Sequence, residues 1–131
     1  MKLNLVVLKT LTPDALADFY TQLGLTFEQH RHGTGPLHYA ATLDDVVFEI
    51  YPLPKDKERT DDTLRLGFNV NNLDDLIQRL RANGNKIVKA PALTEWGYVA
   101  VVEDSDGRKM SKKLDARVSP AVIGCIDDFG G

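Results

Sequence analysis

The sequence matches itself when it is shifted by sixty positions, and this internal repeat restricts the fold more than any other feature of the chain. Residues 12–24 lie over residues 72–84 without a gap. Three residues are identical in the two copies, namely Asp14 with Asp74, Leu16 with Leu76, and Gly24 with Gly84. Self-similarity at a fixed spacing indicates that one supersecondary unit is used twice.

The first copy has the pattern of one strand, one helix and three further strands. Residues 3–8 form a short apolar run, which predicts a strand buried on both faces. Thr12 is the expected capping residue of a helix that continues through Pro13 and ends at Gly24. The other strands are expected over residues 26–30, 38–43 and 46–51, with a tight turn at residues 44–45.

The second copy repeats this order. Residues 64–70 alternate strictly between apolar and other side chains, which predicts a half-buried strand. Asn72 is the expected helix cap, and Gly84 is the expected helix end. Three more strands are expected over residues 86–89, 98–103 and 109–114, with a hairpin turn at residues 104–107. The pattern therefore predicts an α+β fold of two βαβββ modules.

We expect one domain over residues 1–116. Its parts are module one at residues 1–53, a charged linker at residues 54–62, and module two at residues 63–116. Residues 117–131 fit neither module and are interpreted as a C-terminal extension.

Composition argues against several classes of partner. With a net charge of −3 over 131 residues, the chain lacks the basic character that nucleic acid requires. It has no apolar run of about 18 residues, so no membrane span is expected. Residues 1–10 are interpreted as containing a first strand rather than a signal peptide. Because Cys125 is the only cysteine, no internal disulfide can form, which favours a cytoplasmic location.

Four local motifs in this order resemble the vicinal oxygen chelate superfamily, which includes glyoxalase, the bleomycin-resistance proteins, methylmalonyl-CoA epimerase and the extradiol dioxygenases. They lie at residues 17–24, 47–50, 96–97 and 104–107, and the resemblance covers about residues 3–115. It implies that the two modules form curled mixed sheets around a cavity, with the helices on the outer faces. It also implies a homodimer in which one module pairs with the other module of a second chain.

Metal-using members of that superfamily place one ligand on each of four strands. Carried over to this sequence, the four positions are Leu5, Glu49, Arg65 and Ser111. A leucine cannot bind a metal, and an arginine would repel one. The resemblance therefore implies a site without a metal or other cofactor, in which Glu49 and Arg65 form a charge pair. That pair either stabilises the fold alone or leaves one partner to bind a charged ligand group.

Aromatic and histidine side chains complete the expected ligand-binding set. Tyr51 points the same way as Glu49 by strand alternation, while Trp96 and Tyr98 stand at the start of a strand expected to line the cavity. His38 aligns with Tyr98 at the sixty-residue shift and is expected near the cavity mouth. The alternative interpretation makes Tyr51 and Tyr98 core residues and Trp96 the packing for a bend.

Other polar residues are given no role in the site. His30 and His32 flank a glycine-containing loop and are expected to be exposed, without chemistry. Lys112 and Lys113 are expected at a solvated sheet edge.

The sequence leaves three functions open. The leading hypothesis is a metal-free protein that binds a cationic or aromatic small molecule, closest in character to the bleomycin-resistance branch. The second is a metal-dependent lyase, isomerase or dioxygenase that takes ligands from outside the four positions, such as His38 with Glu49. The third is metal-free acid–base catalysis, with Glu49 as the general base. An enzymatic role is the less favoured of these interpretations.

Overall fold

The computed structural model describes residues 1–54 and 61–114, and the chain divides into two compact units, Met1–Asp61 and Asp62–Gly131. Each unit is described by itself. Most of the expected linker, the end of module two, the C-terminal extension and Cys125 lie outside the described residues.

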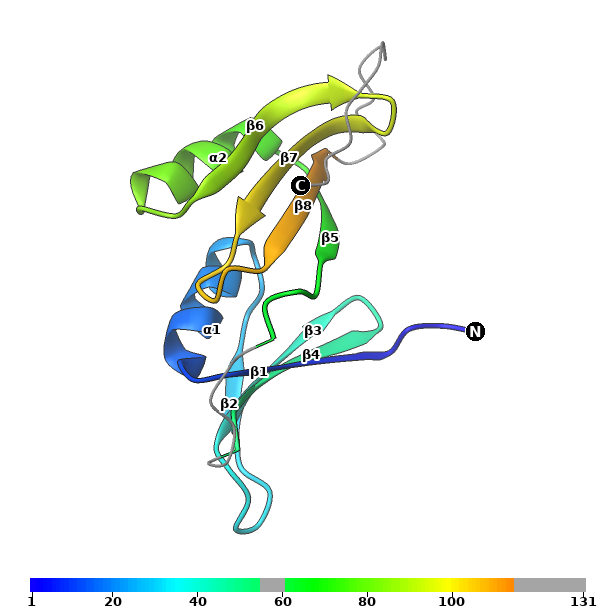
Figure 1. Ribbon diagram of the computed structural model, residues 1–131. Helices are drawn as coiled ribbons and strands as arrows, with labels where there is room; N and C mark the ends of the chain where they lie inside the picture. Colours follow the sequence, from blue (N-terminus) through cyan, green and yellow to red (C-terminus); the bar gives the residue numbers. More distant parts are fainter. Residues whose placement is uncertain (55–60, 115–131) are drawn as a thin grey trace. The chain divides into compact units, whose positions relative to one another are not determined.

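The first unit contains one helix and an open four-stranded sheet, which we call sheet A (Figure 1). The strand order is β1-β4-β3-β2, with β1 parallel to β4 and the other pairs antiparallel. The helix packs on β1, β3 and β4 and so covers one face of the sheet. The elements are β1 (Leu5–Thr10), α1 (Pro13–Gln22), β2 (Glu28–His30), β3 (His38–Leu43) and β4 (Val46–Pro52).

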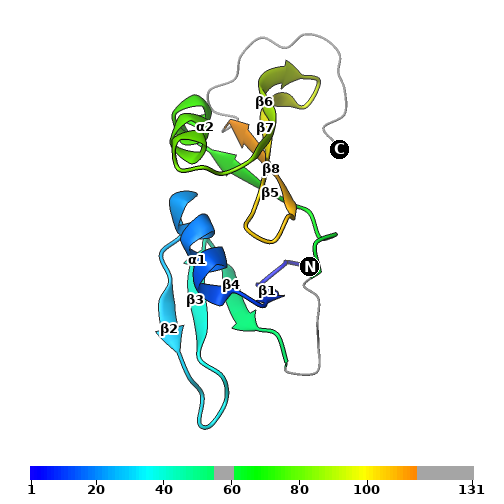
Figure 2. The same ribbon diagram turned by 60° about the vertical axis from the view of Figure 1, so that its left-hand side comes forward.

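The second unit has the same arrangement, which confirms the predicted α+β repeat (Figure 2). Its sheet, sheet B, has the order β5-β8-β7-β6, with β5 parallel to β8. The helix packs on β6 and β8. The elements are β5 (Leu66–Val70), α2 (Leu73–Ala82), β6 (Ile87–Thr94), β7 (Gly97–Glu103) and β8 (Lys109–Leu114).

The first strand differs from its prediction in position and in burial. It begins at Leu5 and continues to Thr10. Leu8 and Thr10 are buried beneath α1, whereas the alternate residues Leu5 and Val7 are 48% and 38% exposed. The prediction of a strand buried on both faces is therefore wrong, because the apolar run belongs to a strand with one helix-covered face.

The two helices begin after the predicted N-cap residues and end just before the predicted glycines, but the expected side-chain capping hydrogen bonds are absent. Gly24 and Gly84 follow them with φ of +114° and +86°, a conformation that glycine adopts without steric cost. Neither Thr12 nor Asn72 makes a side-chain capping hydrogen bond. The Thr12 N–H donates instead to Oγ1 of Thr10, at 3.0 Å, so the preceding strand supplies the hydroxyl.

β6 runs beyond its predicted end at residue 89 and continues to Thr94. This extension includes Pro91, although proline cannot donate a hydrogen bond within a sheet. The strand accommodates Pro91 because β6 is an edge strand and its pairing with β7 shifts register between Lys89 and Ala92. Among the described residues, no helix is both long enough and apolar enough to cross a membrane.

Each core lies between a helix and its sheet. In the first unit Tyr20 of α1 contacts Phe48 of β4, with ring centroids 5.0 Å apart. In the second unit the predicted apolar stripe of α2 is buried on the side of the helix that packs on sheet B. Its members are Leu73, Leu76, Ile77 and Leu80.

Lys112 lies in the second of these cores and not at a solvated edge. β8 is an inner strand, and the Lys112 side chain is fully buried, with its Nζ 4.4 Å from the Phe68 ring centre. Burial lowers the Lys112 pKa to about 7, although the nearby Asp104 carboxylate favours the charged form. The expectation for Lys112 is wrong because strand order, which the sequence does not display, made β8 central.

The β7–β8 hairpin encloses a charged cluster. Gly107 turns the chain with φ of +93°, as predicted. Arg108 is buried and pairs with Asp104 at 3.2 Å and with Asp106 at 2.8 Å. Asp104 also accepts the backbone N–H groups of Asp106 and Arg108. The hairpin is thus a buried ionic turn.

Candidate functional site

The face of sheet A opposite α1, which we call open face A, carries several polar side chains of the first unit. Strand alternation places Glu49 and Tyr51 on it together. The strand register sets Val7 of β1 and Ala40 of β3 on either side of Glu49. Glu49 therefore stands near the middle of this face and not at its rim.

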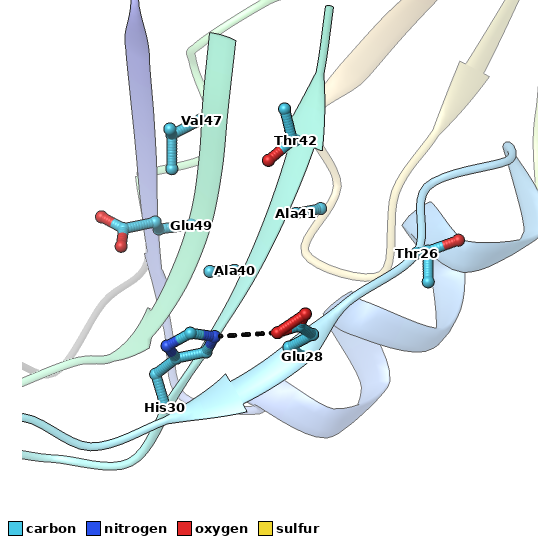
Figure 3. Close-up of a pocket in the computed structure, with 8 residues that line it drawn as sticks. All are labelled: Thr26, Glu28, His30, Ala40, Ala41, Thr42, Val47 and Glu49. Atoms are coloured by element: carbon cyan, nitrogen blue, oxygen red, sulfur yellow. Dashed lines mark ion pairs between the residues drawn. The ribbon is translucent and has the colours of Figure 1, made fainter.

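A groove of about 520 Å³ lies on open face A (Figure 3). Its carboxylates come from Glu28 and Glu49, and the His30 Nε2 lies 3.4 Å from Oε1 of Glu28. The Glu49 side chain is 19% exposed, so it reaches the groove while being largely desolvated. The lining residues are Thr26, Glu28, His30, Ala40, Ala41, Thr42, Val47 and Glu49.

His38 and Tyr51 form a stacked pair beside Glu49. Their ring centroids are 4.1 Å apart with planes 7° from parallel, and His38 is buried. The His38 Nε2 lies 3.3 Å from the Tyr51 hydroxyl and 3.6 Å from Oε2 of Glu49. The structure thus brings together three of the predicted residues.

The second His38 nitrogen fixes the tautomer. His38 Nδ1 lies 3.3 Å from the carbonyl oxygen of Pro36, which can only accept, so Nδ1 carries a proton. In neutral His38, Nε2 is then an acceptor for the Tyr51 hydroxyl. In protonated His38, Nε2 would form an ion pair with the Glu49 carboxylate across 3.6 Å. His38 Nε2 thus lies close to both the Tyr51 hydroxyl and the Glu49 carboxylate.

His30 and His32, for which the sequence predicts no chemistry, lie next to His38. The ring centroid of His38 is 6.0 Å from that of His30 and 5.2 Å from that of His32. Antiparallel pairing of β2 with β3 sets His30 opposite His38 and so creates the cluster. The available signal was the hairpin itself, because three histidines flank the turn that contains Gly33. His32 is exposed, as predicted, and the His30 side chain is 41% exposed.

Two more of the predicted residues meet on sheet B. Arg65 donates from Nε and Nη2 to the Ser111 hydroxyl, at 3.3 Å and 3.1 Å. On sheet A, the register sets Leu5 opposite Val47, which lies two residues before Glu49 on β4 and therefore on the same face. Each unit therefore holds one pair of the four positions carried over from the resemblance.

Tyr98 and Trp96 are placed apart from these residues. The Tyr98 hydroxyl donates to Oδ1 of Asp74 on α2, at 2.8 Å, and this hydrogen bond raises the Tyr98 pKa. Tyr98 thus lies on the helix-covered face, while His38, its partner at the sixty-residue shift, lies on open face A. A slip of one residue moves a side chain to the other face of a sheet. Trp96 is 47% exposed in the β6–β7 turn, where its N–H donates to Oγ1 of Thr94.

The four positions carried over from the resemblance do not suit a metal ion. Leu5 offers no donor atom, and the Arg65 guanidinium is a cation whose N–H groups point at Ser111. Within residues 1–54 and 61–114, no group of three His, Cys, Asp or Glu side chains could hold a metal ion. We therefore derive no chemical step through a metal.

Comparison with known proteins assigns the family. Residues 2–110 match the Glyoxalase/Bleomycin resistance protein/Dioxygenase superfamily, and the chain belongs to this superfamily. No curated protein matches the chain significantly.

Solved structures show the same fold at low sequence identity. TnmS3, an antibiotic binding protein from Streptomyces sp. CB03234, has a TM-score of 0.69 and 18% identity, over 88% of this chain and 96% of its own. A glyoxalase/bleomycin resistance protein/dioxygenase family enzyme from Burkholderia phytofirmans PsJN has a TM-score of 0.69 and 21% identity, over 87% and 98%. TioX from Micromonospora sp. ML1 has a TM-score of 0.66 and 17% identity, over 86% and 97%. At these identities the likeness establishes the fold alone.

Proposed function

We propose that this protein binds a small organic molecule in the groove on open face A without the help of a metal, in the manner of the bleomycin-resistance branch of its superfamily. The observation that supports this most is the groove itself. It has room for a ring system, and it places the Glu49 carboxylate beside the His38–Tyr51 stack. The similarity to TnmS3, an antibiotic binding protein, agrees with a binding role.

The groove favours a ligand that is both planar and cationic. Glu28 and Glu49 supply negative charge, and Glu49 is sufficiently desolvated for its attraction to a cation to exceed that of an exposed carboxylate. Tyr51 is not one of the lining residues, and it stacks on His38 beside that charge; we propose that its ring edge or free face adds cation–π contact to a ligand that extends beyond the groove. We propose that Leu5, Arg65 and Ser111 also belong to the ligand-binding set.

We further propose that the protein acts as a cytoplasmic homodimer. A dimer agrees with the resemblance on which the four ligand positions rest. The solution mass, measured by gel filtration with light scattering, is expected to be that of two chains. A mass of one chain at working concentration would contradict this part of the proposal.

Glu49→Gln is expected to weaken binding of a planar cation about tenfold or more, because an ionic partner becomes a neutral amide of the same shape. The measurement is a thermal-shift titration with N-methylacridinium and with acridine, which share a ring system and differ in charge. Ligand binding to the native state raises the melting temperature. The loss should be confined to N-methylacridinium.

Glu103→Gln is the matched control for this change. Glu103 pairs with Lys86 in the second unit, and its side chain is 22% exposed, close to the 19% of Glu49. This variant should keep the wild-type response to both compounds. Equal binding of N-methylacridinium by wild type and Glu49→Gln would place the cation site elsewhere. Metal analysis that finds one zinc, nickel or iron per chain would contradict the metal-free proposal.

A second candidate function is acid–base catalysis by Glu49. It is favoured by the 3.6 Å separation between Oε2 of Glu49 and Nε2 of His38, which would allow a proton taken by Glu49 to be passed on. The test is solvent deuterium exchange into an acidic C–H group of a compound that the thermal-shift screen identifies. Exchange catalysed by wild type and lost in Glu49→Gln would support catalysis, whereas no exchange would leave binding as the function.

A further inference from the structure

The groove on open face A has a carboxylate at each of two opposite ends. The strand register sets Glu28 of β2 opposite Ala40 of β3, and it sets Ala40 opposite Glu49 of β4. Because directly paired residues share one face of a sheet, these three residues form a single row across three neighbouring strands. Neighbouring strands lie about 4.8 Å apart, which places the Cα atoms of Glu28 and Glu49 about 10 Å from each other.

The groove runs along this row, across the strands. Ala40, with its small side chain, lies between the two carboxylates and forms the floor (Figure 3). His30 stands two residues after Glu28 and borders the groove on one side. Thr42 and Val47, which are paired with each other, border it on the other side. An elongated molecule that follows the groove would therefore have one end near each carboxylate.

We propose that the ligand of this groove carries a cationic group at each end of a planar body, and that Glu28 contacts the second cation. This inference rests on the proposed function, because Glu49 remains the contact for the first cation. It adds the number of charges on the ligand, the direction in which the ligand lies across the strands, and a residue that determines specificity.

The charges in the groove agree with two cations. No lysine or arginine is among the described residues that line it, so one bound cation would neutralise only one of the two carboxylates. The His30 Nε2, 3.4 Å from Oε1 of Glu28, is charged only when the histidine is protonated. The Glu28 side chain is 74% exposed, against 19% for Glu49, so solvent weakens its attraction for a cation. Glu49 therefore supplies most of the affinity, and Glu28 supplies the preference for a second charge.

Methyl viologen and N-methyl-4-phenylpyridinium test the number of charges. Both compounds consist of two linked six-membered aromatic rings, but the first has a cationic nitrogen in each ring and the second has only one. Affinities are measured by isothermal titration calorimetry at constant ionic strength and at about pH 8, where histidine is ordinarily neutral. Wild type is expected to bind the dication about threefold to fivefold more tightly, the effect usual for one exposed ion pair.

Glu28→Gln is expected to bind the two compounds equally well, because the second cation loses its partner. Its affinity for N-methyl-4-phenylpyridinium should stay that of wild type. Asp45→Asn is the matched control, because the 82% exposed Asp45 lies in the β3–β4 turn of the same sheet and outside the groove lining. This variant should keep the preference for methyl viologen. A preference that survives in Glu28→Gln, or that is lost equally in both variants, would overturn the proposal.

Ala40→Leu tests whether the ligand crosses the middle of the row. A leucine side chain would fill the floor of the groove and should weaken binding of both compounds about tenfold. Ala15→Leu is its control, because Ala15 is exposed on α1, which covers the other face of sheet A, and this variant should bind like wild type. Unchanged affinities in Ala40→Leu would place the ligand away from the row and contradict the proposed direction of binding.

This inference and the proposed function fail in different ways. Glu49→Gln should weaken binding of both compounds. If it does so while wild type binds the two compounds equally, the proposed function stands and the second cation contact is wrong. If wild type binds neither compound, both are contradicted. A preference for methyl viologen that Glu28→Gln abolishes and Asp45→Asn retains supports the second contact.

Discussion

Lys112→Met is expected to raise the free energy of unfolding at neutral pH by up to about 4 kcal/mol. Burial holds the native Lys112 pKa at about 7, against an ordinary value of 10.5 for the exposed side chain of the unfolded chain. The unfolded protein therefore gains a proton that the native protein does not. Methionine fills similar space without this difference, and the described structure shows no hydrogen bond to Nζ that would be lost.

The pH dependence provides the more specific signature. Between about pH 7 and about pH 10 the unfolded state binds more protons at Lys112 than the native state, so wild-type stability should rise with pH through this window. The rise should be absent in Lys112→Met. Tyr39 and Tyr98 act in the opposite direction at higher pH, because hydrogen bonds to Asp14 and Asp74 raise their pKa values. Measurements should therefore stay below the range in which tyrosine titrates.

Urea unfolding followed by circular dichroism at several pH values is the appropriate measurement. Lys113→Met is the matched control, because it is the next residue of β8 and points to the other face of sheet B. It should retain the wild-type rise of stability with pH. A Lys112→Met variant that is less stable than wild type at neutral pH would show that Nζ is stabilised by a contact other than Phe68.

Asp104→Ala is expected to lower the free energy of unfolding by about 3–5 kcal/mol, the usual range when one partner of a buried ion pair is removed. The Asp104 side chain is fully buried, and that of Arg108 is 2% exposed. Asp104 pairs with Arg108 and also accepts the backbone N–H groups of Asp106 and Arg108. When Asp104 is removed, the buried Arg108 guanidinium keeps Asp106 as an ionic partner among the described residues. The backbone N–H groups of Asp106 and Arg108 lose the carboxylate that accepts their hydrogen bonds.

The loss of stability in Asp104→Ala should come from the buried Arg108 charge that is left without Asp104, and not from the loss of an aspartate in a turn. Asp45→Ala tests this, because Asp45 stands in the equivalent hairpin of the first unit and its ion pair with Lys2 is exposed. Chemical denaturation should show a change below about 1 kcal/mol for Asp45→Ala. The double variant Asp104→Ala, Arg108→Met should recover part of the loss. If the double variant is as unstable as Asp104→Ala, the backbone hydrogen bonds of Asp104 carry the effect.

The fold could be predicted from the sequence to a large extent. The sixty-residue repeat, the two helices and the alternation in β5 depend on local patterns, and the structure contains all of them. Strand ends were less predictable. β6 passes through Pro91 only because it lies at an edge and shifts register there.

The candidate site was predictable only in part. Glu49, Tyr51 and His38 meet on open face A, and Arg65 meets Ser111 on sheet B. Of the positions carried over from the resemblance, Leu5 and Glu49 lie on open face A, while Arg65 lies just before β5 and contacts Ser111 of β8. Histidine clustering could not be predicted residue by residue, because it depends on the β2–β3 pairing that sets His30 opposite His38. The sequence does not show directly which residues of these two strands pair.

The sequence by itself determined the two βαβββ modules, their glycine-ended helices and the Gly107 turn, because each of these depends on neighbouring residues. Only the tertiary structure decided that Lys112 is buried, that Tyr98 faces α2, and that His38 is buried beside Glu49. The physical reason is that strand order and register set which face of a sheet each side chain occupies and what covers that face. Both are decided by pairing between strands that are distant in the sequence. The internal repeat thus determined the architecture, and strand pairing within each sheet decided which side chains lie together on each face.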